Sequence, residues 1–259
     1  MDYLVYFLGP LMLGVAGARI LRQRFAIFFT GSVAFLLAWV VMQMVTGVAT
    51  QTLHISEKSF LYGLIVSLLA GLCEESTRFV VFRQFGAFNR NRHWPASTMY
   101  ALGHSGMETV IVGLTLVLIA AVLKYKPDAV SDPALLQQCR ETMALAPGLR
   151  LYNAFERLLI GLLIHTCFSA VVMLCFVRAQ IRWWFVAGLW HFAHNLIGFN
   201  LHRLSDHWIV SKAWIAIVIV FYTWIFIRLR RALDVQPPVH LPTAMAGPPP
   251  MILPGRSRD

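Results

Sequence analysis

The apolar residues of this chain are grouped into continuous runs of about 20, and this grouping constrains its fold more than any other feature. A helix of that length rises ~1.5 Å per residue and crosses a hydrocarbon core of ~30 Å. Hydrophobic residues make up 58% of the sequence and charged residues 13%, which excludes a soluble domain and a disordered chain. A membrane barrel would show alternating strands instead of continuous runs. The sequence therefore predicts an all-α fold, a polytopic membrane helical bundle.

Seven runs are predicted to be transmembrane helices: 3–20, 25–47, 59–82, 95–123, 153–178, 183–202 and 208–228. We expect them to form one bundle within residues 1–236, with the polar site on the spans within 59–202. From residue 237 to 259 the sequence is too rich in proline for a helix, and we expect a flexible tail there.

The formal net charge of +10 comes from basic residues in short turns and the tail, where they fit anionic membrane lipids better than nucleic acid. With an external N-terminus, the cytoplasmic turns and tail hold three, three, two and five Lys/Arg, 13 in all, against seven on the opposite side. Because basic residues favour the cytoplasmic side, we expect N-out, C-in topology in a bacterial inner membrane. The segment 124–152 would then lie outside, as a cap or a substrate entrance. No nucleic-acid partner is expected.

Four of the six glutamates lie inside these apolar runs, together with two arginines and four histidines. An unpaired charge at the bilayer centre costs between ~2.5 and more than ~10 kcal/mol, depending on the method. Side chains of this kind should therefore face one another around a polar cavity. They are Glu74, Glu75, Glu108, Glu156, Arg78, Arg157, His104, His165, His191 and His194.

The third run contains two adjacent glutamates, Glu74 and Glu75, and Arg78 follows them by one helical turn. On a helix Arg78 can pair with either carboxylate, but the two carboxylates point about 100° apart. One glutamate can therefore be held by Arg78 while the other faces the cavity. An ion pair that only neutralises itself would need a single glutamate, so the second one indicates a function.

The fourth run places His104 and Glu108 four residues apart, so that both side chains project from one helix face. This spacing lets two side chains bind one metal ion or relay one proton. A packing histidine beside a satisfied glutamate is the structural alternative.

The fifth run begins with Glu156 and Arg157, which could anchor the helix end or join the site. His165 and Ser169 share a face deeper in the same run. They could serve the cavity as a ligand, a hydrogen-bond donor or a support for other side chains.

The sixth run presents His191 and Asn195 on one face, and His194 to one side of it. The amide of Asn195 can orient His191 or stabilise a developing oxyanion. His194 could be a supporting residue or a hydrogen-bonded packing residue.

The polar side chains as a set indicate a reaction class. No Ser/His/Asp triad can be built, because the predicted spans contain no Asp, and no phosphate-binding or dinucleotide motif is present. Carboxylates, imidazoles, a guanidinium and an amide supply a base, an electrophile and oxyanion donors for activating water at a carbonyl. The sequence thus favours hydrolysis of a peptide bond inside the membrane.

The order of these motifs resembles that of the YhfC family of intramembrane metalloproteases. The motifs are EESTR at 74–78, GHSGME at 103–108, ER at 156–157 followed by His165 and Ser169, and HFAHN at 191–195. Together they span about half of the chain, roughly residues 70–200. The family is similar in turn to the PrsW proteases and to the CAAX-prenyl and bacteriocin-processing membrane peptidases.

The resemblance implies that one of Glu74 and Glu75 activates water and that Arg78 holds the other. The remaining polar ring would consist of His104, Glu108, His191 and Asn195. The substrate would be a peptide or a membrane protein. Asn195 departs from the Asp-ending form of the motif, and an amide is a poor metal ligand.

Two mechanisms follow from this resemblance, and both stay open at the level of sequence. In the first, zinc is held by His104, His191 and a carboxylate, Glu108 or Glu75, and activates the water. In the second, no metal is needed: a buried glutamate takes the proton from water while His191, Asn195 and His104 steady the oxyanion.

Three other functions use similar residues. A proton-coupled transporter or channel also places Glu, His and Arg in a membrane cavity, although no repeat is visible here. A haem- or quinone-binding electron carrier would use the histidines but not the paired glutamates. In a membrane scaffold, the polar groups would only fix the register of the helices.

Overall fold

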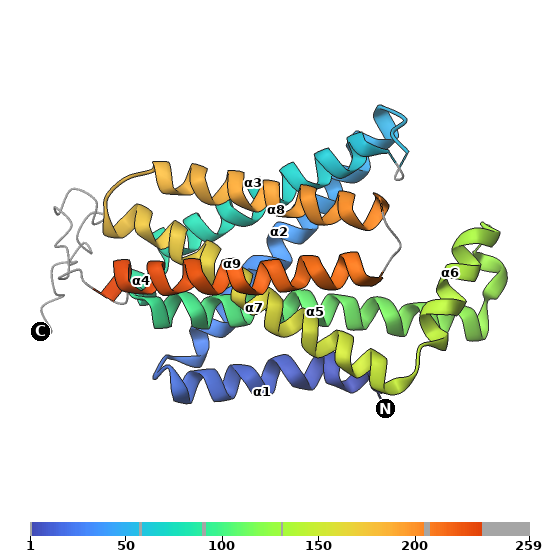
Figure 1. Cartoon of the computed structure of the whole chain (residues 1–259), viewed down its shortest axis with the longest axis horizontal. Coiled ribbons are helices and arrows are strands. Elements are labelled where there is room, and N and C mark those ends of the chain that lie inside the picture. The colour runs from blue at the N-terminus through green and yellow to red at the C-terminus, as the bar shows by residue number, and fades with distance from the viewer. Residues whose placement is uncertain (1, 57–58, 90–91, 131, 205–207, 235–259) are drawn as a thin grey trace, which may run out of the picture.

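The computed structural model describes residues 2–56, 59–89, 92–130, 132–204 and 208–234, and the described residues are helical with short connections and no strand (Figure 1). The elements in chain order are η1 (Asp2–Leu4), α1 (Val5–Ile20), α2 (Phe25–Thr52), α3 (Phe60–Gln84), α4 (Gly86–Asn89), α5 (Trp94–Tyr125), η2 (Pro127–Ala129), α6 (Pro133–Ala144), α7 (Pro147–Val177), α8 (Arg182–Leu204) and α9 (Trp208–Asp234). The predicted tail, residues 237–259, lies outside the described residues.

The predicted all-α membrane bundle is confirmed. Each predicted span coincides with a long helix, and the largest differences in the ends are at α2, α7 and α9, which are longer than expected. By length and composition, α2, α5, α7 and residues 209–234 of α9 can each cross a membrane, with mean hydropathy of 2.0 to 2.4 in their most apolar windows. α1 is a shorter apolar helix. Large apolar side chains are exposed on the outward faces, as lipid contact requires.

Local sequence explains where several of these helices begin. The hydroxyl of Ser59 accepts a hydrogen bond from the backbone N–H of Tyr62 at 3.1 Å, which caps the start of α3. α5 and α7 each have a proline in the first two positions, where the missing N–H costs nothing.

The four helices that carry the polar residues, α3, α5, α7 and α8, form a closed ring together with α2. In order around the ring, α2 contacts α3, α3 contacts α8, α8 contacts α7, α7 contacts α5, and α5 contacts α2. α1 packs against α5 and α9 packs against α7 on the outside of the ring. Side chains that point into this ring face residues of the other ring helices.

The crossing of α2 and α5 depends on two glycines. A Cβ atom on Gly31 would fall on the carbonyl oxygen of Tyr100, and one on Gly103 would fall on the carbonyl oxygen of Phe28. The hydroxyl of Ser32 also donates to the carbonyl of Gly103 at 3.0 Å. This backbone contact fixes the height of the first turns of α5, and with it the position of the polar residues that follow, because small residues allow membrane helices to approach closely.

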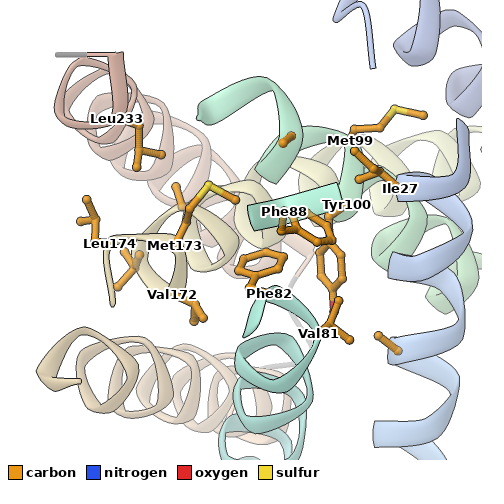
Figure 2. Packing of buried hydrophobic residues seen from close by; sticks show 14 of the residues in the cluster. Ile27, Val81, Phe82, Phe88, Met99, Tyr100, Val172, Met173, Leu174 and Leu233 are labelled. Carbon is orange, nitrogen blue, oxygen red and sulfur yellow. The ribbon is translucent and has the colours of Figure 1, made fainter. Parts of the chain in front are cut away.

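An apolar cluster fills the end of the bundle where α3 ends and α5 begins (Figure 2). The rings of Phe82, Phe88 and Tyr100 lie with centroids 4.6 to 5.9 Å apart, and all three side chains are fully buried. Met173 and Leu174 from α7 join the same cluster. Close packing on this side leaves the polar groups of the ring to face the other end of the bundle.

The segment 124–152, predicted to be a cap or a substrate entrance, is largely helical. It contains the last residues of α5, η2, the polar helix α6 and the start of α7. α6 contacts α5 at the end of the bundle opposite the apolar cluster (Figure 1). Its role as an entrance stays a prediction.

Candidate functional site

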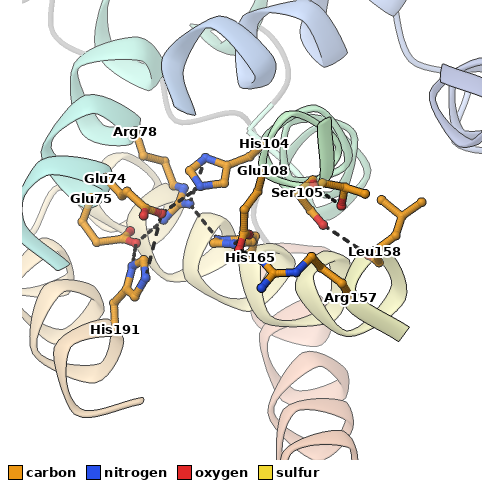
Figure 3. Close-up of polar contacts among 11 residues, drawn as sticks. Glu74, Glu75, Arg78, His104, Ser105, Glu108, Arg157, Leu158, His165 and His191 are labelled. Carbon is orange, nitrogen blue, oxygen red and sulfur yellow. Dashed lines mark hydrogen bonds and ion pairs between the residues drawn. The ribbon is translucent and has the colours of Figure 1, made fainter. Parts of the chain in front are cut away.

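The adjacent glutamates of α3 have different surroundings. Glu75 forms an ion pair with Arg78, and both side chains are fully excluded from solvent (Figure 3). Glu74 points into the ring, where it lines a cavity. Of the two pairings that the helix spacing allowed, the structure therefore adopts the one between Arg78 and Glu75, and Glu74 is left facing the cavity.

Glu74 meets imidazoles from two other helices. Its Oε2 atom lies 2.8 Å from Nε2 of His104 on α5 and 3.8 Å from Nε2 of His191 on α8. No Lys or Arg pairs with Glu74 among the described residues. The carboxylate of Glu74 is thus held by imidazoles, whereas that of Glu75 is paired with a guanidinium group.

His191 joins the two glutamates. Its Nδ1 atom lies 2.8 Å from Oε1 of Glu75, while Nε2 faces Glu74. The ring of Phe168 on α7 packs in parallel against the imidazole. The orientation of His191 is therefore fixed by one hydrogen bond and one stacked ring.

Arg78 contacts two histidines in addition to Glu75. Its Nη2 atom lies 3.5 Å from Nδ1 of His104 and 3.4 Å from Nδ1 of His165 on α7. The two imidazoles lie against each other, with ring centroids 4.2 Å apart. One guanidinium group thus links α3 to both α5 and α7.

Glu108 extends the network toward the end of the bundle opposite the apolar cluster. Its Oε2 atom lies 3.2 Å from Nε2 of His165, and its Oε1 atom accepts a hydrogen bond from Arg157 at 2.7 Å. The side chain of Glu108 is 31% exposed and that of Arg157 is 45% exposed. The network therefore runs without a break from the buried Glu75–Arg78 pair to the partly solvated Glu108–Arg157 pair (Figure 3).

Glu156 does not join this network. Its carboxylate lies 2.6 Å from the ammonium group of Lys212 on α9, and Lys212 also lies over the ring of Tyr152. The sequence left open whether Glu156 and Arg157 anchor the helix end or join the site. Arg157 contacts Glu108 of the network, and Glu156 lies at the rim of the cavity.

A cavity of about 810 Å³ lies beside this network. Its polar side includes Glu74, Glu108, His165 and His191. Its apolar walls come from several helices of the ring and from α9, and include Phe35, Trp39, Val66, Ile111, Ile164 and Trp214. The cavity combines a small number of polar groups with large apolar walls, as is usual for sites that bind organic ligands.

The polar residues lie near the middle of the bundle. His104 and His191 are about ten residues from the first residues of α5 and α8, which corresponds to ~15 Å along a helix. For a hydrocarbon core of ~30 Å, that distance is close to half the thickness. If the first residues of α5 and α8 lie at one edge of the hydrocarbon core, these histidines and Glu74 lie near its middle.

Three predicted residues have less direct contacts. Asn195 and His194 line the cavity, but His191 is oriented by Glu75 and not by Asn195 within the described part of the chain. His194 stacks on Trp214, with ring centroids 5.8 Å apart. Ser169 is fully buried and its hydroxyl has no hydrogen-bond partner among the described residues. The roles of all three stay predictions.

The donor atoms suit a metal ion, although the closest group differs from the predicted one. Ligand atoms of Glu74, His104 and His165 all lie within 4.8 Å of one another, and these are the only three such residues found together among those described. One carboxylate and two imidazoles form a donor set that catalytic zinc uses. The set expected from sequence was His104, His191 and a carboxylate, Glu108 or Glu75. Glu108 pairs instead with Arg157, and His165, expected to be a supporting residue, takes a central position.

Sequence reasoning missed several residues that touch the site. Phe168, Phe35 and Tyr100 contact His191, His104 and Arg78 respectively, and Lys212 pairs with Glu156. Aromatic residues in an apolar run carry no signal that separates site contacts from lipid contacts. Lys212 could have been noticed, because it is a lone lysine near the start of the last span.

The fold and the site define a polytopic helical membrane protein with a buried centre of carboxylates and imidazoles. The chain belongs to the YhfC intramembrane metalloprotease family, whose sequence profile matches residues 11–220. This match confirms the resemblance seen in the motifs and extends it from α1 into α9. The suggested relation to the PrsW and CAAX-prenyl peptidases stays a prediction. Comparison with curated proteins and with solved structures gave no match.

Proposed function

We propose that this protein is an intramembrane endopeptidase that hydrolyses a peptide bond of its substrate, with Glu74 as the general base. The observation that carries the proposal is the contrast between the two adjacent glutamates. Glu75 is committed to Arg78, whereas Glu74 lines the cavity and, among the described residues, pairs only with imidazoles. A carboxylate without a cationic partner at the wall of a cavity is suited to act as a general base.

In the proposed reaction, Glu74 accepts a proton from a water molecule, and the water oxygen attacks the carbonyl carbon of the scissile peptide bond. The carbon–nitrogen bond then breaks. The proton passes from Glu74 to the departing nitrogen, so the products are a carboxylic acid and an amine. The amide of Asn195 would stabilise the oxyanion by donating hydrogen bonds as the substrate enters, and the imidazoles would hold Glu74 and the water.

The family name and the donor set also support zinc at this site. In this second version Glu74 would be a ligand and not the base: Glu74, His104 and His165 would hold the ion, with the predicted His191 and Glu108 beside them. A bound zinc ion would lower the pKa of its water to ~7 and polarise the scissile carbonyl. Glu75 would keep its place behind His191 in either version.

The walls of the cavity indicate the kind of substrate. Trp39, Ile111 and Trp214 present large apolar surfaces beside the polar groups. Such walls favour apolar side chains on both sides of the scissile bond, as found in a membrane-embedded peptide segment. We propose that the substrate is a membrane protein or an apolar peptide dissolved in the bilayer.

The proposed topology has the N-terminus outside and the C-terminus in the cytoplasm of a bacterial cell. The apolar cluster around Phe82 would then face the cytoplasm, and the rim with Glu156 and Lys212 would face outward. The same cluster makes a proton-coupled transporter less suitable, because its close packing opposes a polar path through the whole bundle.

The proposal is tested by mapping peptide termini in membranes of cells that produce the protein. We expect new termini within apolar segments when the wild-type protein is present. They should be absent with Glu74→Gln and retained with Glu141→Gln, a change on the exposed surface of α6. Identical termini in all three samples would contradict a peptidase.

A further inference from the structure

We infer that Arg78 fixes the proton positions on His104 and His165, so that His191 is the histidine whose lone pair faces Glu74. His104, His165 and His191 thereby have separate roles within the proposed function. These roles follow from hydrogen-bond directions, because a guanidinium can only donate, an ionised carboxylate can only accept, and a neutral imidazole does one of each.

Arg78 faces the same ring nitrogen, Nδ1, of His104 and His165. The Nη2 atom of Arg78 carries two N–H bonds and lies 3.5 Å from Nδ1 of His104 and 3.4 Å from Nδ1 of His165. Since Arg78 has no acceptor to offer, both Nδ1 atoms must accept. Each neutral ring then carries its proton on Nε2.

The other nitrogen of each ring, Nε2, faces a carboxylate. Nε2 of His104 lies 2.8 Å from a carboxylate oxygen of Glu74, and Nε2 of His165 lies 3.2 Å from one of Glu108. Both Nε2–H groups therefore have an acceptor. Each ring lies between the guanidinium of Arg78 and one carboxylate. Both of these contacts require the tautomer with its proton on Nε2.

His191 has the opposite arrangement. Its Nδ1 atom lies 2.8 Å from Glu75, whose carboxylate is paired with Arg78 and can only accept. His191 therefore carries its proton on Nδ1, and Nε2 keeps its lone pair. The Nε2 atom lies 3.8 Å from Oε2 of Glu74, beyond the range of a direct hydrogen bond.

The separation between His191 and Glu74 suits a shared water molecule or ion. Glu75 behind His191 repeats the carboxylate–histidine arrangement that orients metal ligands and general bases. His104 and His165, in contrast, direct their lone pairs at Arg78. We therefore assign His191 and Glu74 to the activation of water and His104 to the orientation of Glu74 by its N–H group.

The same geometry makes Arg78 a competitor for a metal ion. An ion at Glu74, His104 and His165 needs a lone pair from each imidazole, and the guanidinium already occupies one lone pair on each ring. A metal can bind both rings only if these contacts with Arg78 are given up. Removing Arg78 should therefore strengthen zinc binding.

The direct test is the tautomer of each histidine in the wild-type protein without metal. Two-bond nitrogen–proton NMR spectra of protein labelled with ¹⁵N-histidine distinguish the two tautomers. His104→Gln, His165→Gln and His191→Gln assign the signals by their loss. We expect Nε2–H for His104 and His165 and Nδ1–H for His191. An Nδ1–H signal from His104 or His165 would overturn the inference.

Zinc binding provides a second test. The double variant Glu75→Gln/Arg78→Met removes the donor groups without changing the net charge, and the amide oxygen introduced by Glu75→Gln can still accept from His191. We expect this variant to bind zinc at least about tenfold more tightly than the wild type, while Glu75→Gln alone, which keeps Arg78, does not. Equal zinc affinity in a folded double variant would contradict competition by Arg78.

These measurements do not depend on proteolysis. If no cleavage is found but the tautomers are as assigned, the proposed function fails and the role of Arg78 stands. If cleavage requires Glu74 but His191 carries its proton on Nε2, the proposed function stands and this inference fails. Should the double variant not fold, the NMR measurement on the wild-type protein still decides.

Discussion

The imidazole of His191 stacks on the phenyl ring of Phe168, with ring centroids 4.5 Å apart and an angle of 16° between the planes. Stacking fixes the plane of the imidazole, and the hydrogen bond to Glu75 fixes its rotation within that plane. Nε2 of His191 is thereby directed toward Glu74. Two residues from different helices, one apolar and one acidic, thus determine where the free nitrogen points.

We expect Glu74→Gln to abolish cleavage without unfolding the protein. An amide keeps the shape of the side chain but cannot accept a proton from water, and loss of a general base typically lowers rates between about a hundredfold and ten-thousandfold. The rate is measured with a substrate identified from the mapped termini, and thermal unfolding is followed in parallel. Retention of more than a tenth of the activity by Glu74→Gln would exclude it as the base.

The Glu75–Arg78 pair should matter for stability more as a pair than as two residues. Arg78→Met leaves Glu75 buried without its partner, and breaking a buried pair in this way costs about 3–5 kcal/mol. The double variant Glu75→Gln/Arg78→Met should recover most of that loss. Thermal unfolding in detergent compares the two variants, and an equally large loss in both would show that packing, and not charge, is responsible.

Gly103→Ala should reduce activity by moving α5. The added methyl group would meet the carbonyl of Phe28, so α2 and α5 must separate and His104, one residue later, must shift. A displacement of about 1 Å can cost on the order of a hundredfold in rate. Gly47→Ala is the matched control on α2, because a Cβ atom there meets nothing within 4 Å. Equal activity of the two variants would refute a rigid crossing.

Arg157→Gln should affect activity more than stability. Its pair with Glu108 is partly solvated, and exposed ion pairs contribute about 0–1 kcal/mol to folding. Without Arg157, Glu108 is less fixed and holds His165 less firmly, so we expect an activity loss of about tenfold. Arg140→Gln, on the exposed surface of α6, is the control. Unchanged activity in Arg157→Gln would place the Glu108–Arg157 pair outside the working part of the site.

Much of the fold could be predicted from the sequence because each apolar run is long and continuous. The ends were less well defined: α7 begins at Pro147, well before the predicted start at residue 153, because the polar residues of its first turns are also compatible with a loop. The position of α6 could not be predicted, since its polar sequence gives no information about which end of the bundle it contacts.

The candidate site shows a similar division. Costly side chains in apolar runs indicated which residues should meet, and the structure places Glu74, His104 and His191 together. Their partners depend on helix rotation, which spacing alone does not define. For example, four-residue spacing indicated that His104 and Glu108 share a helix face, and in the ring they contact different partners, Glu74 and Arg157.

The chain carries its own counter-charges into the lipid bilayer. Glu75 and Glu108 are each matched by an arginine from within the sequence, so insertion and assembly of the helices do not have to wait for an ion from the cell. Protein produced under zinc starvation should therefore still accumulate in its folded form. If zinc is the cofactor, as proposed, this folded protein would bind the metal on its arrival without new synthesis.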